Sequence, residues 1–177
     1  MSKNFCKTFI IIFLIISEFF AKNTFSATVS SISVSNPIGF GLINPNTGGT
    51  LKTSTGCATA SGTAYSMGQS ASSICANGSF FISGTNNRTG GNRNRIRVTI
   101  PASTTITFSG RTMNIALSLS STANVTSQNF NLSGASNGPG NVTVPVYATI
   151  TVGSNQFSGN YAGSFNFMAC NNNLASC

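Results

Sequence analysis

Apolar side chains alternate with polar ones along most of this chain, and this spacing limits the fold more than any other feature. The longest run has an apolar residue at every second position: Val142, Val144, Val146, Ala148, Ile150 and Val152. Successive side chains of a strand point to opposite faces, so the run predicts a strand with one buried face. Shorter runs of the same kind occupy 94–100, 113–119 and 161–169, whereas no segment after residue 27 keeps a helical period for three turns.

Turn sequences separate these runs at intervals of 8–12 residues. Asn137-Gly138-Pro139-Gly140 is one such turn, placed directly before the longest run. About eight short strands with this spacing are typical of an antiparallel β-sandwich with Greek-key connections. We therefore expect one all-β domain over residues 28–169, without an internal repeat or a second domain.

Residues 1–27 have the three-part organisation of a secretory signal peptide. Lys3 and Lys7 precede an unbroken apolar run, FIIIFLII at 9–16, and the small residues Ser26 and Ala27 follow. The apolar run is shorter than the roughly 20 residues that span a bilayer. We expect cleavage near residues 26/27, with an uncleaved N-terminal anchor as the alternative. The mature chain would then have no membrane span and would reach a bacterial periplasm, the cell surface or the medium.

The side chains available for chemistry argue against an enzyme. The sequence contains a single acidic residue, Glu18, and no histidine. Glu18 lies in the predicted signal peptide, so the mature chain lacks the groups that general acid–base catalysis and most metal sites require. We expect no catalytic residue, no metal and no cofactor. A small hydrolase using Lys52 or a new N-terminal Thr28 as its base is a minor alternative.

Four cysteines follow the signal peptide: Cys57, Cys75, Cys170 and Cys177. An even number in an exported chain predicts structural disulfides. Three pairings are possible, and the short separations favour Cys57–Cys75 and Cys170–Cys177. The second bridge would tether a C-terminal tail, residues 170–177. No two of these cysteines have the spacing of a zinc site.

Arginines concentrate in one part of the chain. Arg93, Arg95 and Arg97 are two residues apart, so on a strand they share one face, and Arg88 is close by. Two interpretations are open: a stripe that contacts an anionic glycan, or a solvated face that limits aggregation. The sequence favours the solvated face. Nucleic acid is a poor partner because the chain is exported and no aromatic residues interleave with the arginines.

Three stretches, in order, resemble an exported bacterial family known as domain-of-unknown-function family 4402. The motif residues are Phe40, Gly41, Gly48 and Gly49 near the start, 81–84 with 98–101 in the centre, and Gly159, Tyr161, Gly163 and Phe165 near the end. The last pattern is also similar to spore-coat-U-type proteins, which include pilin subunits. The resemblance implies an immunoglobulin-like, pilin-like sandwich and brings no catalytic residues. The Cys57–Cys75 region and the C-terminal tail depart from the family pattern.

These observations lead to two functional hypotheses. The first is a non-enzymatic structural or adhesive surface protein, with a pilus-like (fimbrial) subunit as its specific form. Its partner would be a second copy or a homologous subunit, joined by exchange of the strand that contains Ile32, Val34 and Ile38. The alternative is a self-contained secreted module that binds surface glycans or other anionic ligands through the loop 84–92 or the arginine stripe.

Overall fold

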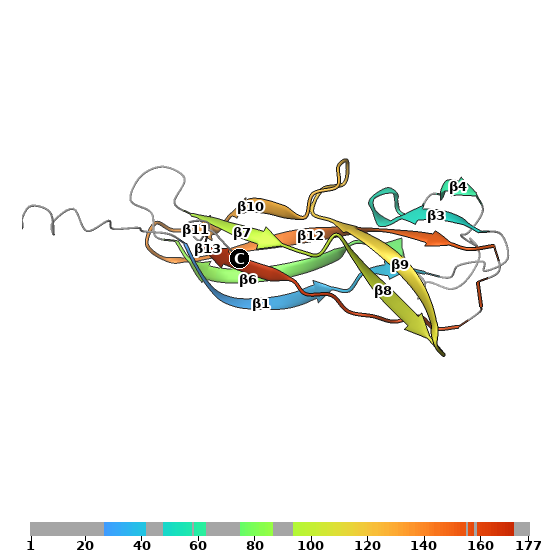
Figure 1. The fold of residues 1–177 in the computed structure, drawn as a ribbon. Helices are drawn as coiled ribbons and strands as arrows, with labels where there is room; N and C mark the ends of the chain where they lie inside the picture. Colours follow the sequence, from blue (N-terminus) through green and yellow to red (C-terminus); the bar gives the residue numbers. More distant parts are fainter. Residues whose placement is uncertain are drawn as a thin grey trace, which may run out of the picture.

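The computed structural model describes residues 27–41, 48–57, 59–62, 75–86, 94–154, 156–157 and 159–171. Except for Ala27, the predicted signal peptide lies outside these ranges. All strand pairings in the described part of the chain are antiparallel, and strands from separate sheets share one hydrophobic core (Figure 1). The protein is therefore an all-β sandwich, as the sequence predicts. No helix within these ranges is long and apolar enough to cross a membrane.

The described elements are β1 (Thr28–Asn36), β2 (Gly39–Phe40), β3 (Gly49–Lys52), the 3-10 turn η1 (Thr53–Thr55), β4 (Thr59–Gly62), β5 (Cys75–Ala76), β6 (Gly78–Thr85), β7 (Arg95–Thr99), β8 (Ser103–Phe108), β9 (Arg111–Ser118), β10 (Ser127–Asn131), β11 (Ser133–Gly134), β12 (Pro139–Val152) and β13 (Met168–Asn171).

The long strand β12 connects the two halves of the molecule. Its first half, Pro139–Val146, pairs with β6, and β1 lies on the other edge of β6. Its second half pairs with β9 on one side and β3 on the other, and β8 and β4 follow outward from these two strands. The predicted alternation of β12 is confirmed, since Val144, Val146 and Ile150 are fully buried.

The opposite layer has the order β10-β7-β13. Strands β7 and β8 follow each other across Pro101 and pair with β10 and β9, respectively, so that 95–131 forms one long, bent hairpin. The C-terminal segment runs along the other side of this hairpin. Ala162 exchanges two backbone hydrogen bonds with Thr107 of β8, at 2.8 and 3.2 Å, and β13 then pairs with β7.

The C-terminal strand is shorter than the sequence predicts. Alternation from Tyr161 to Ala169 suggests one continuous strand, but residues 163–167 have no strand geometry and β13 begins only at Met168. The segment moves here from β8 to β7, and among the described residues no strand pairs with its other edge. Because this segment has one neighbouring strand at a time and changes from β8 to β7 along its length, its ladder of backbone hydrogen bonds is interrupted.

Candidate functional site: an open groove beside β1

The inner face of β1 is uncovered. Ile32 lies opposite Ile82 of β6, and Val34 lies opposite Phe80. Directly opposed residues of an antiparallel pair share a face, and Ile82 is fully buried, so Ile32 and Val34 point toward the core side of the sheet. Nevertheless, 40% of Ile32 and 62% of Val34 remain exposed. These two apolar side chains are therefore only partly covered within the described part of the chain.

A groove of about 790 Å³ opens at this place, between the end of β1 and residues 156–165. Its lining is uncharged and largely apolar, and it reaches core side chains of the neighbouring strands. The residues that define it are Val34, Ile38, Phe80, Ile106, Ile115 and Phe165. The groove thus gives direct access to the space between the two layers of the sandwich.

Two glycines of the predicted family motif set the far wall of the groove. A Cβ atom on Gly163 would collide with the backbone oxygen of Thr105, and one on Gly159 would collide with the ring of Phe108. Residues 159–164 can therefore approach β8 closely, which the hydrogen bond from Thr104 Oγ1 to the Ser164 carbonyl (2.7 Å) reinforces. The wall follows β8 instead of closing over β1.

Tyr161 anchors this wall. Its hydroxyl accepts a hydrogen bond from the Gln156 amide at 2.6 Å and donates one to the Phe157 carbonyl at 3.1 Å. Its ring packs against Phe108, with centroids 5.7 Å apart. The ring also lines the groove.

Three phenylalanines close the groove toward β13. Phe80 stacks on Phe167 with ring centroids 3.9 Å apart, and it meets Phe165 edge-on at 5.8 Å. These contacts bridge the two layers, because Phe80 belongs to β6 and the other two precede β13. At this end β1 also lies close to β13. The sequence motif contained Phe165, but reasoning from sequence did not assign Phe80 or Phe167 to a site, although their spacing on alternating runs was a usable signal.

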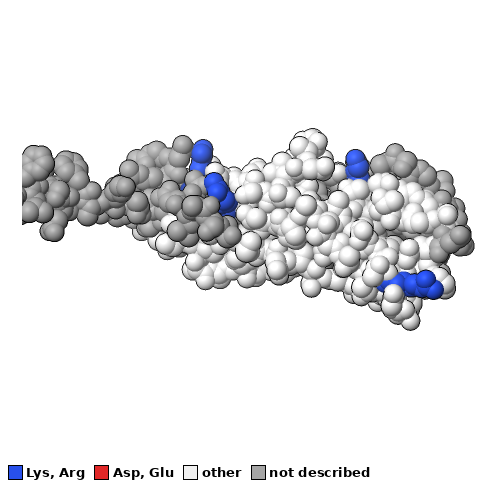
Figure 2. Space-filling model, viewed as in Figure 1, with Lys and Arg blue, Asp and Glu red and all other residues white. Residues whose placement is uncertain are grey.

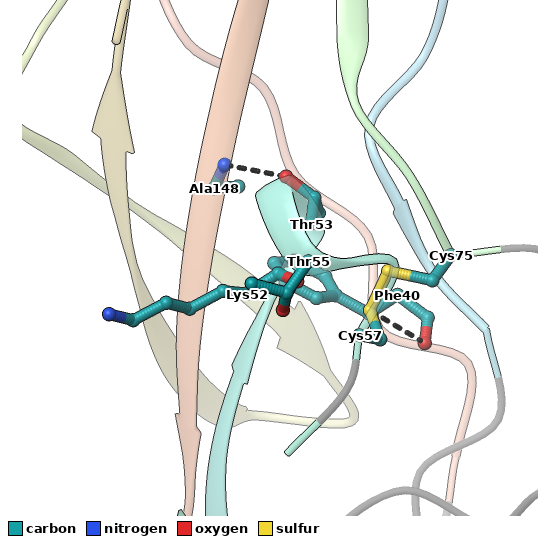
Figure 3. Close-up of a disulfide and its surroundings, with 7 residues drawn as sticks. All are labelled: Phe40, Lys52, Thr53, Thr55, Cys57, Cys75 and Ala148. Atoms are coloured by element: carbon teal, nitrogen blue, oxygen red, sulfur yellow. Dashed lines mark hydrogen bonds between the residues drawn. A yellow bond between two sulfur atoms is a disulfide. The ribbon is translucent and has the colours of Figure 1, made fainter. Parts of the chain in front are cut away.

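A disulfide braces the opposite end of the groove. Cys57 and Cys75 are bonded, with Cα atoms 5.7 Å apart, which confirms the first predicted pair. The bridge ties β5 to the turn that follows η1, β5 pairs with β2, and Cys57 Sγ lies 3.8 Å from the carbonyl oxygen of Phe40 (Figure 3). Cys170 is also disulfide-bonded. Its predicted partner Cys177, with the rest of 172–177, lies outside the described residues.

The early glycine motif supports the same end of the groove. Phe40 is buried in the core, and Gly41, with φ +67°, lines the groove. Gly48 and Gly49 also have positive φ, +62° and +134°, as the chain enters β3. Positive φ is readily accessible to glycine alone, which accounts for these three positions.

The predicted arginine stripe is only partly within the described residues. Arg95 and Arg97 share the outer face of β7, as expected, while Arg88 and Arg93 lie outside the described ranges. β7 is the middle strand of its sheet, so these charges are not edge charges. On the face shown in Figure 2 the basic side chains occupy separate places instead of one band. Arg111 lies at the start of β9, and its guanidinium stacks over the Phe157 ring at 4.1 Å from the ring centroid.

The fold and the groove together define a class: disulfide-braced, all-β sandwich proteins with one uncovered edge strand. Within that class, the chain belongs to the family described as Domain of unknown function (DUF4402), whose profile matches residues 31–169. The match includes residues 31–36 of β1, the groove and the first two residues of β13. No curated protein and no solved structure matches the chain significantly.

Proposed function

We propose that this protein is a non-enzymatic, exported structural or adhesive subunit of the bacterial surface, and that its groove accepts an extended strand of another copy. The observation that carries the proposal is the exposure of Ile32 and Val34 on the core side of β1. Such side chains are normally covered by an opposing strand. A strand from outside the subunit would supply the missing cover, in the manner of a pilus-like polymer.

Three properties of the groove favour a strand over a small ligand. The groove follows β1, whose outer backbone edge has no paired strand among the described residues. β1 is therefore held by β6 alone among these residues, and once β1 leaves, an incoming extended peptide can pair with the freed edge of β6 and place alternate side chains in the cavity. The groove lining is uncharged, so it suits a segment in which apolar residues alternate with small polar ones.

The segment that fits best within this chain is β1 itself. Residues 27–36, ATVSSISVSN, contain no charge and alternate apolar residues with serine. Edge strands usually carry lysine or other charges that prevent pairing with further chains, and β1 has none of these. Because its inner side chains are half exposed, β1 loses little apolar burial when it leaves β6.

Exchange between copies would also relieve a geometric restriction. Within one subunit, β1 continues through Asn36 and Pro37 into β2, which the disulfide-linked β5 holds in place. This short connection keeps β1 at the edge of β6. A β1 strand from another copy has no such tether and can settle between β6 and the far wall.

The test uses mature monomer and synthetic peptides of residues 28–42. The wild-type peptide and a Ser33→Asp peptide should raise the melting temperature, because Ser33 faces outward, opposite Phe81. A Val34→Asp peptide should have no effect, since it would bury a charge in the groove. A monomer whose melting temperature responds equally to all three peptides, or to none, would contradict strand exchange and favour the alternative of a self-contained binding module.

A further inference from the structure

A second hollow lies on the outer face of the sheet formed by β3, β12 and β9. Its volume is about 320 Å³, and its lining differs sharply from that of the groove. The residues that give it its chemistry are Lys52, Ala116, Ser120, Asn124, Tyr147 and Thr149. The hollow therefore presents one ammonium group, one phenol ring, an amide and several hydroxyls.

Strand register brings these side chains together. Thr149 of β12 pairs with Lys52 of β3 on one side and with Ala116 of β9 on the other. Two residues earlier on β12, and on the same face, Tyr147 pairs with Ser118 of β9. Neighbouring strands are about 4.8 Å apart, so Lys52 and Ala116 stand roughly 10 Å from each other across β12. Because the Ala116 side chain is small, the surface is depressed at this position.

One wall is held in shape by a single hydroxyl. Ser118 Oγ accepts hydrogen bonds from the backbone N–H groups of Ser120 (3.0 Å) and Val125 (3.1 Å) and donates to the Ala123 carbonyl (2.6 Å). Ser118 is buried, so these bonds are shielded from water. They fix the loop 119–125, which carries Asn124, before any ligand arrives.

The other wall is the turn that begins at Lys52. Thr53 Oγ1 accepts a hydrogen bond from the Ala148 N–H at 2.9 Å, and the Lys52 carbonyl accepts bonds from Thr55 Oγ1 (3.0 Å) and the Cys57 N–H (2.9 Å). The disulfide follows directly. Figure 3 shows the Lys52 side chain pointing away from this braced turn, so its backbone is fixed while its ammonium group is free to meet a ligand.

Two polar groups of the hollow lack a partner among the described residues, whereas Ser118 and Ser120 make hydrogen bonds within their own loop. Among the described residues, the Tyr147 hydroxyl makes no hydrogen bond, whereas that of Tyr161 makes two. Lys52 has no carboxylate side chain to pair with in the mature chain, because Glu18 is the only acidic residue of the sequence. The site therefore presents the Lys52 ammonium and the Tyr147 hydroxyl as unused donors, beside the half-buried ring of Tyr147.

The geometry points to an acidic saccharide as the ligand of this hollow. A sugar carboxylate would pair with Lys52, and ring hydroxyls would bond to Thr149, Ser120 and Asn124. The apolar face of the sugar ring would rest on Tyr147, which has a ring face and a polar tip. A single ammonium suits one carboxylate better than a polyphosphate, and the hydroxyl-rich lining does not suit an apolar ligand. This inference stands independently of strand exchange.

The test is a titration of mature protein with a hyaluronan tetrasaccharide, which contains glucuronic acid, and with chitotetraose as the neutral counterpart. Affinity is measured by calorimetry or by NMR shifts, at low and at physiological salt. We expect hyaluronan tetrasaccharide to bind more tightly than chitotetraose. Lys52→Gln should lower its affinity at least tenfold and remove this preference, and Tyr147→Ala should weaken binding of both sugars.

Arg111→Gln is the matched control, because it removes one cation at the β8–β9 turn, outside the hollow. It should leave both affinities unchanged. Equal losses for Lys52→Gln and Arg111→Gln would show binding through net charge only and would overturn the assignment. The assignment would also be overturned if wild-type protein with a normal melting curve did not bind the acidic sugar at millimolar concentration.

Discussion

Strands β9 and β1 have the same sequence pattern but opposite environments. In β9 the alternating residues Met113, Ile115 and Leu117 are 8%, 5% and 3% exposed, whereas Ile32 and Val34 of β1 are 40% and 62% exposed. β9 pairs with β8 on one edge and β12 on the other, while among the described strands β1 pairs with β6 alone. Alternation therefore identifies the apolar face of a strand, but the strands around it decide whether that face is covered.

The difference has an energetic consequence. Full burial of a valine or isoleucine side chain stabilises a fold by about 1.5–3 kcal/mol relative to exposure. β9 already contributes this energy to folding. Much of the apolar surface of Ile32 and Val34 in β1 stays in water, so an incoming strand that covered this surface would gain the free energy of burying it. The open side of the molecule is thus a place where apolar energy can drive association.

The largest effect we expect comes from the disulfide at the braced end of the groove. Replacing both Cys57 and Cys75 by serine should lower the free energy of unfolding by about 3 kcal/mol, because the bridge closes a loop with a sequence separation of 18. Urea unfolding measures this change. A loss below about 1 kcal/mol would mean that packing alone holds β5 against β2.

The next experiment compares two valines directly. Val146→Ala in the core should cost about 2–3 kcal/mol, from lost burial plus a cavity. Val34→Ala should cost less than about 0.6 kcal/mol, since most of this side chain is already in water. Urea unfolding of dilute, monomeric protein gives both values. Equal costs would show that β1 is covered within the monomer and that the groove is closed.

A smaller effect is expected at the far wall of the groove. Tyr161→Phe keeps the ring and removes a hydroxyl that joins Gln156 to Phe157, so it should cost about 1 kcal/mol. Tyr147→Phe is the control, because the Tyr147 hydroxyl has no partner among the described residues, and its loss should change stability by less than about 0.5 kcal/mol. A similar cost for both variants would contradict the anchoring role.

The sequence was sufficient to predict what depends on local pattern. The strands at 95–99, 111–118 and 139–152 and the Cys57–Cys75 bridge follow from alternation and cysteine spacing. The close approach of Gly163 to β8 also fits the glycine motif.

What depends on cross-strand register could not be predicted in the same way. The interruption at 163–167 arises where the segment changes partner from β8 to β7, which alternation does not reveal. The meeting of Lys52, Thr149 and Ala116 requires the register of three strands far apart in sequence. The groove likewise exists because no described strand covers β1, and a sequence pattern shows strands without showing their neighbours.

The smallest effect we expect is that of pH on the free energy of unfolding, and it should be small for the covered strand β9 and for the open strand β1 alike. After residue 26 the sequence contains no Asp, Glu or His, so no side chain changes its charge between pH 4.5 and 7. Native and unfolded chains then bind equal numbers of protons, and the free energy of unfolding should vary by less than about 0.5 kcal/mol in this range. Urea unfolding across the range checks this. A clear loss in acid would indicate that Glu18 is retained and paired.

Because the sequence after residue 26 has no Asp, Glu or His, a carboxyl group introduced into a donor peptide can serve as a specific probe of the groove beside β1. A Val34→Asp donor peptide should not bind near neutral pH, because its charged form would be buried and burial raises the pKa of a carboxyl group. Protonation favours the bound state, so capture of this peptide should return as the pH falls below about 4. Capture of a Val34→Asn peptide should stay weak at every pH. If the Asp peptide fails equally at pH 3 and pH 7, position 34 of the donor does not enter the groove.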